Sequence, residues 1–530
     1  MQLCAAAPRA PALRRPAPRV RRSRCVPCGA SAGRLGDTAV VVGASLGGVL
    51  SAAALSPHFR RVLVLDRDAA LPGVGDSPGF APRRGVPQSS QPHVLFARGL
   101  SELELALPGV TADALAAGAL RVDWASDFKV WAGGAWAAQS ERGQGQSQGG
   151  EVASLTCSRY LLESAARRRL AATARNVEFR PKARVASLLR DGDAVCGVVL
   201  DNDEALTAAL TVDAAGRGSC CAAWLAQAGF PDAVAAPAAA TVDGGLRYAT
   251  RVFRLPPGVA EDDDSLGFKV LLLSHEAPSA RRLGYAARLE GGRLVATLGG
   301  YERDAPPLDD AGWRAFAASL PGDGAFLAAL RDAQPEAGYE VAQAHAATAN
   351  IRRTFRPVPG LVHVGDAALA LCPAYGQGMT MAALAAAALR NAAAKAADDV
   401  AAGRADAAAA LATLAAATAE PMPEARAAWA LAAGQDAAFP AAVVSSSDDA
   451  DGGAVKAKKA AMPPPLAWYV AALRRRAAAD PDVWRAMLRV AHLLAPPQSL
   501  FAPGLAASVI AAEARDAWRR RRGAPKDAAA

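Results

Sequence analysis

The pattern of apolar positions near the start of the chain predicts a strand, a helix and a second strand. Residues 38–42 (TAVVV) form a β-branched run of the kind found in buried parallel strands. A glycine-rich turn and an alanine-rich, helix-forming stretch follow, and Pro57 ends that stretch. Residues 62–65 (VLVL) form the second apolar run, which ends at Asp66. Together these segments have the length of one β-α-β unit, about 30 residues.

Farther along the chain, the spacing of apolar residues is typical of helices in some segments and of strands in others. Residues 158–174 predict an amphipathic helix with Ser158 as its N-cap, and residues 183–200 predict a hairpin. Apolar and polar residues alternate in several runs between about 240 and 345, which favours an antiparallel sheet in a separate domain. A short buried strand near residues 361–365 and an alanine-rich helix then return to the α/β pattern.

These patterns predict an α/β fold with a Rossmann-like domain, an inserted antiparallel β-sheet domain and a helical C-terminal region. A chain of 530 residues has room for several such units. The boundaries that we expect are a leader over residues 1–36, a discontinuous Rossmann-like domain over 37–235 and 346–400, a β-rich domain over 236–345, and a helical region over 401–530 with a linker near 445–465.

The net charge of +9 is concentrated at the N-terminus. Residues 1–36 hold eight arginines and no acidic residue, and taking these from the 59 basic residues leaves 51 against 50 acidic ones. An arginine-, alanine- and proline-rich leader without acidic residues resembles an organellar transit peptide, which predicts a plastid or mitochondrial location. The alternative is a disordered extension from an alanine- and arginine-biased genome, in which case the protein would remain in the cytoplasm.

The composition excludes several classes of protein. Aromatic residues make up 5% of the chain, too few for a base-stacking nucleic-acid module, and the eight cysteines are too irregular for a disulfide framework. The only C-x-x-C, from Cys25 to Cys28, has no second pair, so we expect no metal site. The longest apolar stretch, residues 40–56, has a strand-turn-helix pattern, and we expect neither a transmembrane segment nor a nucleic-acid partner.

The first β-α turn carries the strongest local signal for a nucleotide site. Gly43 allows a tight turn, Ser45 stands where the backbone must approach phosphate groups, and Gly48 permits close packing of helix on strand. Asp66, 23 residues after Gly43, can accept hydrogen bonds from an adenosine ribose, which favours FAD or NAD over NADP. The pattern is G-x-S-x-x-G, which departs from G-x-G-x-x-G by one small residue. A glycine-rich turn without a ligand is the alternative.

Two later segments resemble FAD-binding motifs. Residues 212–219 (VDAAGRGS), which include Asp213, resemble the D-A-S/A-G-x-x-S segment of FAD-dependent monooxygenases, halogenases and isoprenoid reductases. Residues 361–379 resemble the second FAD motif of these families, G-D-A…P…G-x-G. The positions that match it are Gly365, Asp366, Pro373, Gly376 and Gly378.

The resemblance implies a role for these positions. Asp366 would accept a hydrogen bond from the ribityl chain of FAD, and Pro373 with residues 376–378 would bring backbone close to the flavin ring. The helix that begins after Gly378 would direct its positive end at the N1–C2=O edge of the flavin and so stabilise reduced, anionic flavin.

Three motifs in this order, over residues 38–390, resemble the flavoprotein monooxygenase-like branch of the FAD/NAD(P)-binding superfamily, which has the fold of the aromatic hydroxylases. The resemblance implies that the Rossmann-like domain binds FAD and that the β-rich domain over residues 236–345 is the substrate domain. In that family a helix that opens with arginine places this side chain near the FAD phosphates, a role that would fall to Arg159. A surface arginine at a helix start is the alternative.

Residues 84–93 (RGVPQSSQPH) resemble a loop found in a branch of largely uncharacterised FAD-dependent oxidoreductases. The geometry of the family would place this loop near the flavin, which makes Gln88 and His93 candidates for contact with flavin or substrate. The alternative is a proline-kinked loop whose histidine bonds backbone carbonyls.

The rest of the sequence lacks the motifs of several other enzyme classes, and it identifies no catalytic residue. The halogenase signature Trp-x-Trp-x-Ile-Pro is absent, and so are the HExxH, P-loop and Gly-x-Ser-x-Gly motifs of other enzyme classes. Cys-Cys-Ala follows Ser219, where hydroxylases that contact NADPH carry a later arginine. The electron donor, NADH or NADPH, therefore stays open.

We predict an FAD-dependent oxidoreductase, specifically a monooxygenase that uses reduced flavin and O₂ to insert oxygen into a small-to-medium apolar or aromatic organic molecule. The cofactor carries the reactive chemistry, so few acid–base residues are needed. The alternative is an FAD-dependent reductase, dehydrogenase or cyclase of isoprenoid or carotenoid type that inserts no oxygen. A basic nucleic-acid or membrane-binding protein is a distant alternative, supported only by the +9 charge.

Overall fold

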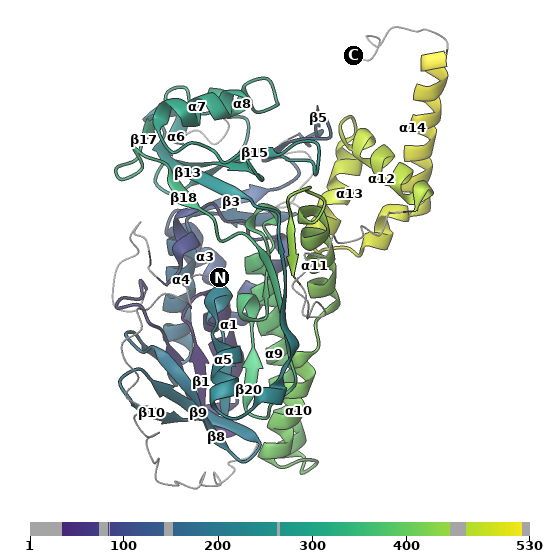
Figure 1. Cartoon of the computed structure of the whole chain (residues 1–530). Helices are drawn as coiled ribbons and strands as arrows, with labels where there is room; N and C mark the ends of the chain where they lie inside the picture. The colour runs from purple at the N-terminus through teal and green to yellow at the C-terminus, as the bar shows by residue number, and fades with distance from the viewer. Residues whose placement is uncertain are drawn as a thin grey trace.

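The computed structural model describes residues 34–73, 83, 85–141, 152–261, 265–445 and 463–521. The leader expected over residues 1–36, with Cys25 and Cys28, lies outside the described residues except for its last three positions, and so does most of the expected linker near 445–465. The described residues form an α/β body, a second β-sheet unit at one end of it, and C-terminal helices at its side (Figure 1). This arrangement confirms the predicted fold class.

The predicted β-α-β unit lies at the centre of a five-stranded parallel sheet with the strand order β20-β11-β1-β2-β7. Its strands are β1 (Gly36–Val42), β2 (Phe59–Leu65), β7 (Val177–Arg180), β11 (Leu210–Asp213) and β20 (Leu361–His363). Val42 pairs with Leu65 on one side and with Asp213 on the other. The residues that follow these strands therefore lie along one edge of the sheet, which is where ligands bind in open α/β folds.

Successive side chains of β1 point to opposite faces of the sheet and pack against two different layers. Ala39 and Val41 contact a helical layer, and Val40 and Val42 contact an antiparallel layer. The helical layer contains α1 (Leu46–Leu55), α2 (Ala97–Ala106), α3 (Val110–Ala116), α4 (Arg159–Thr173), α9 (Gly378–Ala401) and α10 (Ala407–Ala419). The antiparallel layer contains β8 (Val185–Asp191), β9 (Ala194–Leu200), β10 (Ala205–Thr207) and α5 (Cys221–Gln227).

Several local predictions for this body are confirmed. Strands β8 and β9 form the hairpin expected over residues 183–200. The Ser158 side chain caps α4 by accepting a hydrogen bond from the backbone N–H of Leu161 at 3.2 Å. Helix α9 begins at Gly378, as the alanine-rich stretch predicted.

The second unit is an eight-stranded sheet, with the order β17-β13-β16-β15-β14-β4-β5 and with β18 beside β13. Its strands are β4 (Phe128–Ala132), β5 (Ala135–Trp136), β13 (Arg247–Arg254), β14 (Val270–Leu273), β15 (Arg282–Leu289), β16 (Arg293–Gly300), β17 (Gln334–Pro335) and β18 (Gln343–His345). Helices α7 (Asp310–Ala318) and α8 (Ala325–Ala328) cover one face, where Trp313 is fully buried. The antiparallel sheet expected over residues 236–345 is present, but residues 128–136 extend it because β4 pairs in parallel with β14.

Two long strands connect the two units. β12 (Val234–Asp243) and β19 (Asn350–Phe355) pair in an antiparallel arrangement, and the shorter β21 (Leu369–Ala370) and β22 (Val443–Ser445) complete a four-stranded sheet. The region after residue 401 is mostly helical, as expected, and it also contains the short strand β22. Three residues carry no period of their own, and β22 is ordered by its pairing with β12.

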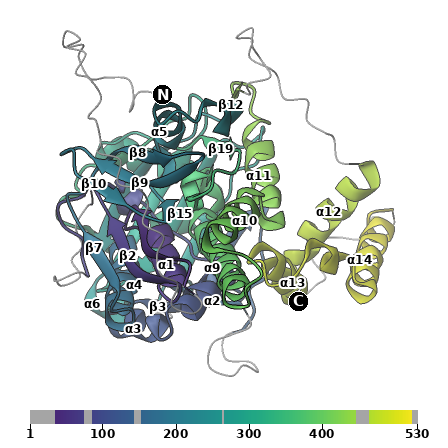
Figure 2. The ribbon, with the colours of Figure 1, turned by 90° about the horizontal axis from the view of Figure 1, so that it is seen from below.

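The C-terminal region packs against the α/β body and then extends away from it (Figures 1 and 2). Its helices are α11 (Pro423–Asp436), α12 (Pro464–Ala477), α13 (Pro481–Ala491) and α14 (Pro503–Arg521), and the elements not yet named are β3 (Leu120–Asp123), β6 (Ala153–Thr156) and α6 (Pro257–Glu261). None of the helices in the described part of the chain combines the length and the hydropathy that crossing a bilayer requires.

His492, just after α13, joins this region to the body. Its ring lies between Phe96 and Trp124, and its Nδ1 accepts a hydrogen bond from the backbone N–H of Ala97 at 3.1 Å. Burial lowers the pKa of His492 to about 3. Burial also lowers the pKa of His93 to about 3 and the pKa values of His275 and His345 to about 4. The folded protein therefore holds four histidines neutral at pH values where they would be protonated in the unfolded chain.

The free energy of unfolding is expected to fall as the pH decreases below about 6.5, because the unfolded chain then binds protons that the folded chain binds only near pH 3–4. Each histidine contributes about 1.4 kcal/mol per pH unit in this window. His492→Gln keeps an acceptor for Ala97 and removes one titrating group, so urea unfolding at pH 7.5, 6.5 and 5.5 should show a shallower pH dependence by about that amount. Equal slopes in the variant and the wild type would contradict a neutral, buried His492.

Candidate functional site

The turn between β1 and α1 requires glycine at two positions. Gly43 has φ +110°, and a Cβ there would lie 2.4 Å from the carbonyl oxygen of Ala214. A Cβ on Gly48 would lie 1.8 Å from the carbonyl oxygen of Gly43. Any larger residue at either position would displace the turn, so the sequence pattern corresponds to a close approach of backbone to backbone.

Asp66 lies beside this turn at the end of β2, as its place in the sequence predicted. It is 8% exposed. Its carboxylate accepts hydrogen bonds from the backbone N–H of Ala44 at 2.8 Å and of Asp68 at 2.9 Å, and from the Arg83 guanidinium at 3.1 Å. A carboxylate has about four acceptor positions, so Asp66 retains capacity for one further donor.

Glu163, on α4, connects the turn to three arginines. Its carboxylate accepts hydrogen bonds from the Ser45 hydroxyl at 2.5 Å, from Arg83 and Arg159 at 2.7 Å each, and from Arg167 at 2.9 Å. The side chain is 1% exposed. Burial alone would raise the pKa of Glu163, but the three guanidinium groups hold it below its usual range. Glu163 is therefore a buried anion at the base of the turn.

Arg159 is the member of this cluster that reaches the surface of the turn. It donates to the Ser45 hydroxyl at 2.8 Å, and its side chain is 11% exposed, whereas that of Arg83 is 4% exposed. Arg167 is fully buried, donates to the carbonyl oxygens of Ala44 and Pro72, and leaves its Nη2 without a hydrogen-bond partner within the described residues. The structure thus brings together Gly43, Ser45, Gly48, Asp66 and Arg159, all of which the sequence analysis singled out.

The sequence analysis assigned no function to Glu163 and did not identify Arg83. A signal for Glu163 was available, because Arg159, Glu163 and Arg167 are spaced by four residues along one helix and so share a face. Arg83 lies 17 residues from Asp66 along the chain, and no local sequence pattern connects the two.

The second predicted motif lies at the same edge of the sheet, after β20. Gly365 and Gly376 have φ +63° and +65°, and Gly378 begins α9. The Asp366 side chain points toward this helix start, since a Cβ on Gly378 would lie 3.8 Å from Asp366 Oδ1. Pro373 opens the short 3₁₀ turn that leads to Gly376.

Two polar groups at this helix start have no hydrogen-bond partner in the described part of the chain. They are the carboxylate of Asp366 and the buried Oε1 of Gln377. Burial raises the pKa of Asp366, while Arg217, Arg159 and Arg353 oppose that shift. Buried polar groups are normally hydrogen-bonded. The buried Gln377 Oε1, with the partly buried Asp366 carboxylate at the same helix start, therefore fits a site that takes a polar ligand such as the ribityl chain and ring edge of FAD.

His93 lies next to Arg159. The hydrogen bond that the structure shows for Gln88 is made by its backbone carbonyl oxygen. His93 and Arg159 line a cavity of about 10 Å³, room for about one water molecule, together with Met379 on α9. The His93 Nδ1 lies 2.7 Å from the Gln91 carbonyl oxygen, and the Gln88 carbonyl oxygen accepts from the Gln91 N–H. Because the pKa of His93 is about 3, its ring is neutral near pH 7. Arg84, which opens this motif, lies outside the described residues.

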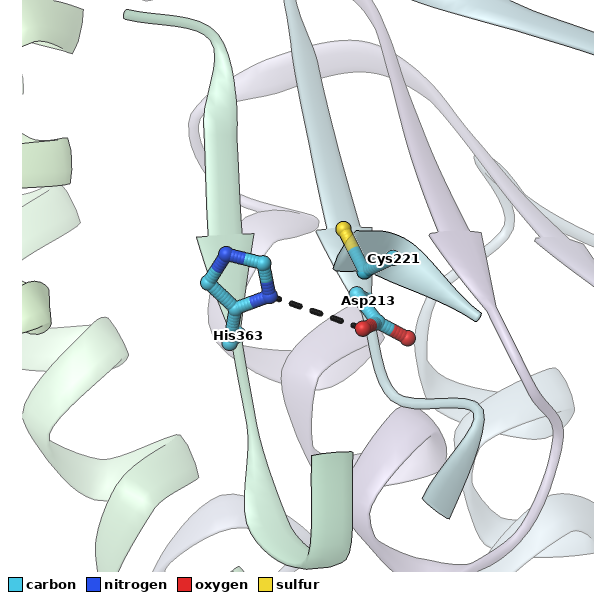
Figure 3. A group of neighbouring side chains, drawn as sticks. All are labelled: Asp213, Cys221 and His363. Carbon is cyan, nitrogen blue, oxygen red and sulfur yellow. Dashed lines mark hydrogen bonds and ion pairs between the residues drawn. The ribbon is translucent and has the colours of Figure 1, made fainter. Parts of the chain in front are cut away.

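Asp213 supports the turn that follows β11 (Figure 3). Its carboxylate accepts hydrogen bonds from the Ser219 hydroxyl at 2.6 Å and from the Ala215 N–H at 3.0 Å, and His363 Nδ1 lies 3.5 Å away. Leu210 and Val212 pack on the helical layer, so Asp213, at odd spacing from both, points to the opposite face. The resemblance implied that Asp213 contacts the cofactor, and this stays a prediction; the hydrogen bonds that the structure shows for its carboxylate lie within its own turn.

Cys221 completes a group of three potential metal ligands with Asp213 and His363, whose donor atoms lie within 4.8 Å of one another. Two features oppose metal binding there. Asp213 already accepts the hydrogen bonds described above, and burial raises the pKa of the Cys221 thiol, whereas a metal requires the thiolate. We assign these three side chains to local structure.

A second buried carboxylate, Asp436 at the end of α11, connects the flavin-motif loop to the sheet unit. It accepts hydrogen bonds from the Tyr375 hydroxyl at 2.7 Å, the Tyr301 hydroxyl at 3.1 Å and the Asn350 amide at 2.7 Å. Phe439 stacks on Tyr301 with ring centroids 4.1 Å apart. The sequence analysis missed this cluster because its members come from four distant segments with no shared pattern.

Glu163→Gln is expected to destabilise the fold by about 3–5 kcal/mol, because it leaves Arg83, Arg159 and Arg167 buried without their shared anion. The matched control is Glu178→Gln, which breaks an exposed ion pair with Arg61 and should cost less than about 1 kcal/mol. Urea unfolding at pH 7.5 measures both. A Glu163→Gln protein as stable as the control would show that the cluster does not hold the turn.

The family of this chain is shown by a relative of similar sequence and not by a family model. No family model matches it. Protein Rv3254 of Mycobacterium tuberculosis is 34% identical over 376 residues, which are 68% of this chain and 74% of that protein.

Solved structures show where the same fold occurs. PqsL of Pseudomonas aeruginosa, a probable FAD-dependent monooxygenase, is 17% identical with a TM-score of 0.51 over 76% of this chain and 96% of its own. The Diels-Alderase PyrE3 of pyrroindomycin biosynthesis is 15% identical with a TM-score of 0.50 over 86% of this chain and 80% of its own. At these identities the likeness establishes the fold alone. The chain therefore has the fold of FAD-dependent monooxygenases and belongs to the same family as protein Rv3254 of Mycobacterium tuberculosis.

Proposed function

We propose that the protein is an FAD-dependent oxidoreductase and that it acts as a monooxygenase on a small-to-medium apolar or aromatic molecule. The observation that carries the proposal is the pair of unpartnered polar groups, Asp366 and Gln377 Oε1, at the start of α9. They lie at the same sheet edge as the glycine turn and Asp66. The two sets of groups match the two halves of FAD.

Each half of the site offers donors or acceptors that suit the cofactor. The Gly43–Gly48 turn and Arg159 would hold the diphosphate, since free N–H groups and a guanidinium favour an anion. Asp66 would accept one hydrogen bond from the adenosine ribose, and Asp366 one from the ribityl chain. The N-terminus of α9 would face the N1–C2=O edge of the flavin with its partial positive charge. When bound, the flavin supplies the transfer of electrons between a reductant, the substrate and O₂.

The chain's own contribution near the substrate is apolar enclosure more than acid–base chemistry. Tyr301, Tyr375 and Phe439 form an aromatic cluster between the sheet unit, α11 and the loop after Pro373. Burial lowers the pKa of His275, which packs against Tyr301, to about 4. It is therefore neutral near pH 7. Such surroundings suit an apolar or aromatic substrate and exclude water from the flavin.

An FAD-dependent reductase, dehydrogenase or cyclase is the second candidate. It stays a candidate because the Asp213–Ser219 segment, which forms a hydrogen-bonded turn here, resembles a segment of isoprenoid reductases as well as of monooxygenases. Steady-state O₂ uptake separates the candidates. A monooxygenase consumes O₂ in step with hydroxylated product, tested with NADH and NADPH as reductants, whereas substrate turnover without O₂ uptake would support the second candidate.

Asp366→Asn should weaken FAD binding by about 10- to 100-fold, the cost of losing one charge-assisted hydrogen bond. The unliganded variant should be at least as stable as the wild type, because Asp366 is a partly buried carboxylate without a partner in the described chain. The control, Asp193→Asn, changes a fully exposed carboxylate and should leave both quantities unchanged. Absorbance at the flavin band after gel filtration, with thermal unfolding of the unliganded protein, measures the two effects. Normal FAD retention by Asp366→Asn would contradict the assignment.

A further inference from the structure

The helices α12, α13 and α14, residues 463–521, expose an unusual amount of apolar surface. Ten large hydrophobic side chains are exposed in the described residues, and five of them lie in this unit, which we call the α12–α14 unit. In Figures 1 and 2, α12 and α14 extend away from the α/β body, and α12 is tied to the rest of the chain at its end, where the Ala138 N–H donates a hydrogen bond to the Ala477 carbonyl oxygen at 2.9 Å. The five side chains are Leu466, Trp468, Phe501, Ile510 and Trp518, which are 36–55% exposed.

The exposed residues of α14 follow one side of the helix. Ala507, Ile510, Ala514 and Trp518 are all exposed, and at about 100° per residue they form a stripe about 80° wide. Val509 is fully buried and lies on the opposite side, where it packs in the unit's own core. Helix α14 is therefore apolar on two faces, of which one packs in the unit's own core and the other is exposed.

Helix α12 shows the same division. Trp468 and Ala471 are exposed on one side of the helix, while Tyr469 and Leu473 are buried on the other, in the core shared with α14. Leu466, also exposed, lies at the start of the helix on the side of Leu473. Helices α12 and α14 are fixed to one another by an ion pair between Arg475 and Glu513, with distances of 2.9 and 2.8 Å. The exposed apolar residues of α12 and α14 thus belong to one packed unit.

The same unit is strongly basic. It holds nine arginines and four acidic residues, a net charge of +5, in a protein whose residues 37–530 are nearly neutral. Glu513, Asp480 and Asp482 each pair with an arginine of the unit. Arg474, Arg515 and Arg519 are exposed and form no ion pair with another described residue.

Exposed tryptophans beside unpaired arginines match the interface of a membrane rich in anionic lipid. Indole rings favour the headgroup level of a bilayer, and each arginine near an anionic surface adds electrostatic attraction. A second copy of the chain fits this surface less well, because two faces of charge +5 would repel each other. The described helices do not span a bilayer, so attachment would be peripheral.

We propose that the α12–α14 unit attaches the protein reversibly to the surface of membranes that contain anionic lipid. The tryptophans and Ile510 insert at the headgroup level, and the unpaired arginines contact lipid phosphates. This proposal does not depend on the flavin chemistry.

Co-sedimentation of the full-length protein with vesicles tests the proposal. The protein should bind vesicles of phosphatidylcholine with about 30% phosphatidylglycerol at about 0.15 M salt, and should bind pure phosphatidylcholine at least about tenfold more weakly. Circular dichroism and the thermal midpoint check that every variant is folded. Equal binding to both vesicles, or no binding to either, would overturn the proposal.

Two sets of substitutions assign the binding to this unit rather than to another part of the chain. Both sets keep the N-terminal arginines intact, so any loss arises from α12–α14. The apolar set is Trp468→Ala, Ile510→Ala and Trp518→Ala, with the equally exposed control set Leu105→Ala, Val341→Ala and Leu431→Ala. The charge set is Arg474→Gln, Arg515→Gln and Arg519→Gln, with the control set Arg60→Gln, Arg184→Gln and Arg404→Gln on the body.

The apolar set should lower the partition coefficient at least about tenfold, and the charge set by about fivefold for each charge removed. The control sets should change it by less than about twofold. Equal losses in test and control sets would contradict the assignment. Light scattering that shows a wild-type dimer and a monomeric apolar set, without vesicle binding, would instead identify the face as an interface between copies and overturn the proposal.

Discussion

A single buried carboxylate, Glu163, determines how the nucleotide edge of this protein is built. Three arginines and the Ser45 hydroxyl donate to it, and these groups come from the β1–α1 turn, from the segment around Arg83 and from helix α4. An anion with so little exposure is tolerated only when several cations compensate it. The positions of Arg159, Arg83 and Ser45 therefore depend on one another, and with them the shape of the turn.

The rest of the site follows from the direction of the parallel strands. Because β20, β11, β1 and β2 all end at one edge, the turn after Val42, the acid after Leu65 and the Gly365–Asp366 segment lie side by side. Like Glu163, Asp436 is a buried carboxylate that connects distant segments. At the other end of the site it joins the Tyr375 loop to the sheet unit and to α11. Two buried carboxylates thus connect segments that are far apart in the sequence.

The parts that local patterns could predict are those in which one stretch of chain determines its own structure. The apolar runs of β1 and β2, the capped helix α4 and the β8–β9 hairpin were predicted on such grounds. Two strand pairings, β4 with β14 and β22 with β12, were not predicted from the sequence. Each depends on a partner strand more than 130 residues away. The cluster around Asp436 escaped for the same reason. The i, i+4 series on α4 was visible in the sequence, but its meaning required Arg83, which only the fold brings near.

The central claim is that this edge binds one FAD per chain through contacts to both halves of the molecule, and titration of the purified protein with FAD and FMN tests it most directly. The purified protein is expected to be yellow and to hold one FAD per chain. FMN should bind at least about 100-fold more weakly, because it lacks the adenosine and the second phosphate that Asp66 and the Gly43–Gly48 turn would contact. A colourless protein that takes up no FAD, or equal affinity for FAD and FMN, would contradict it.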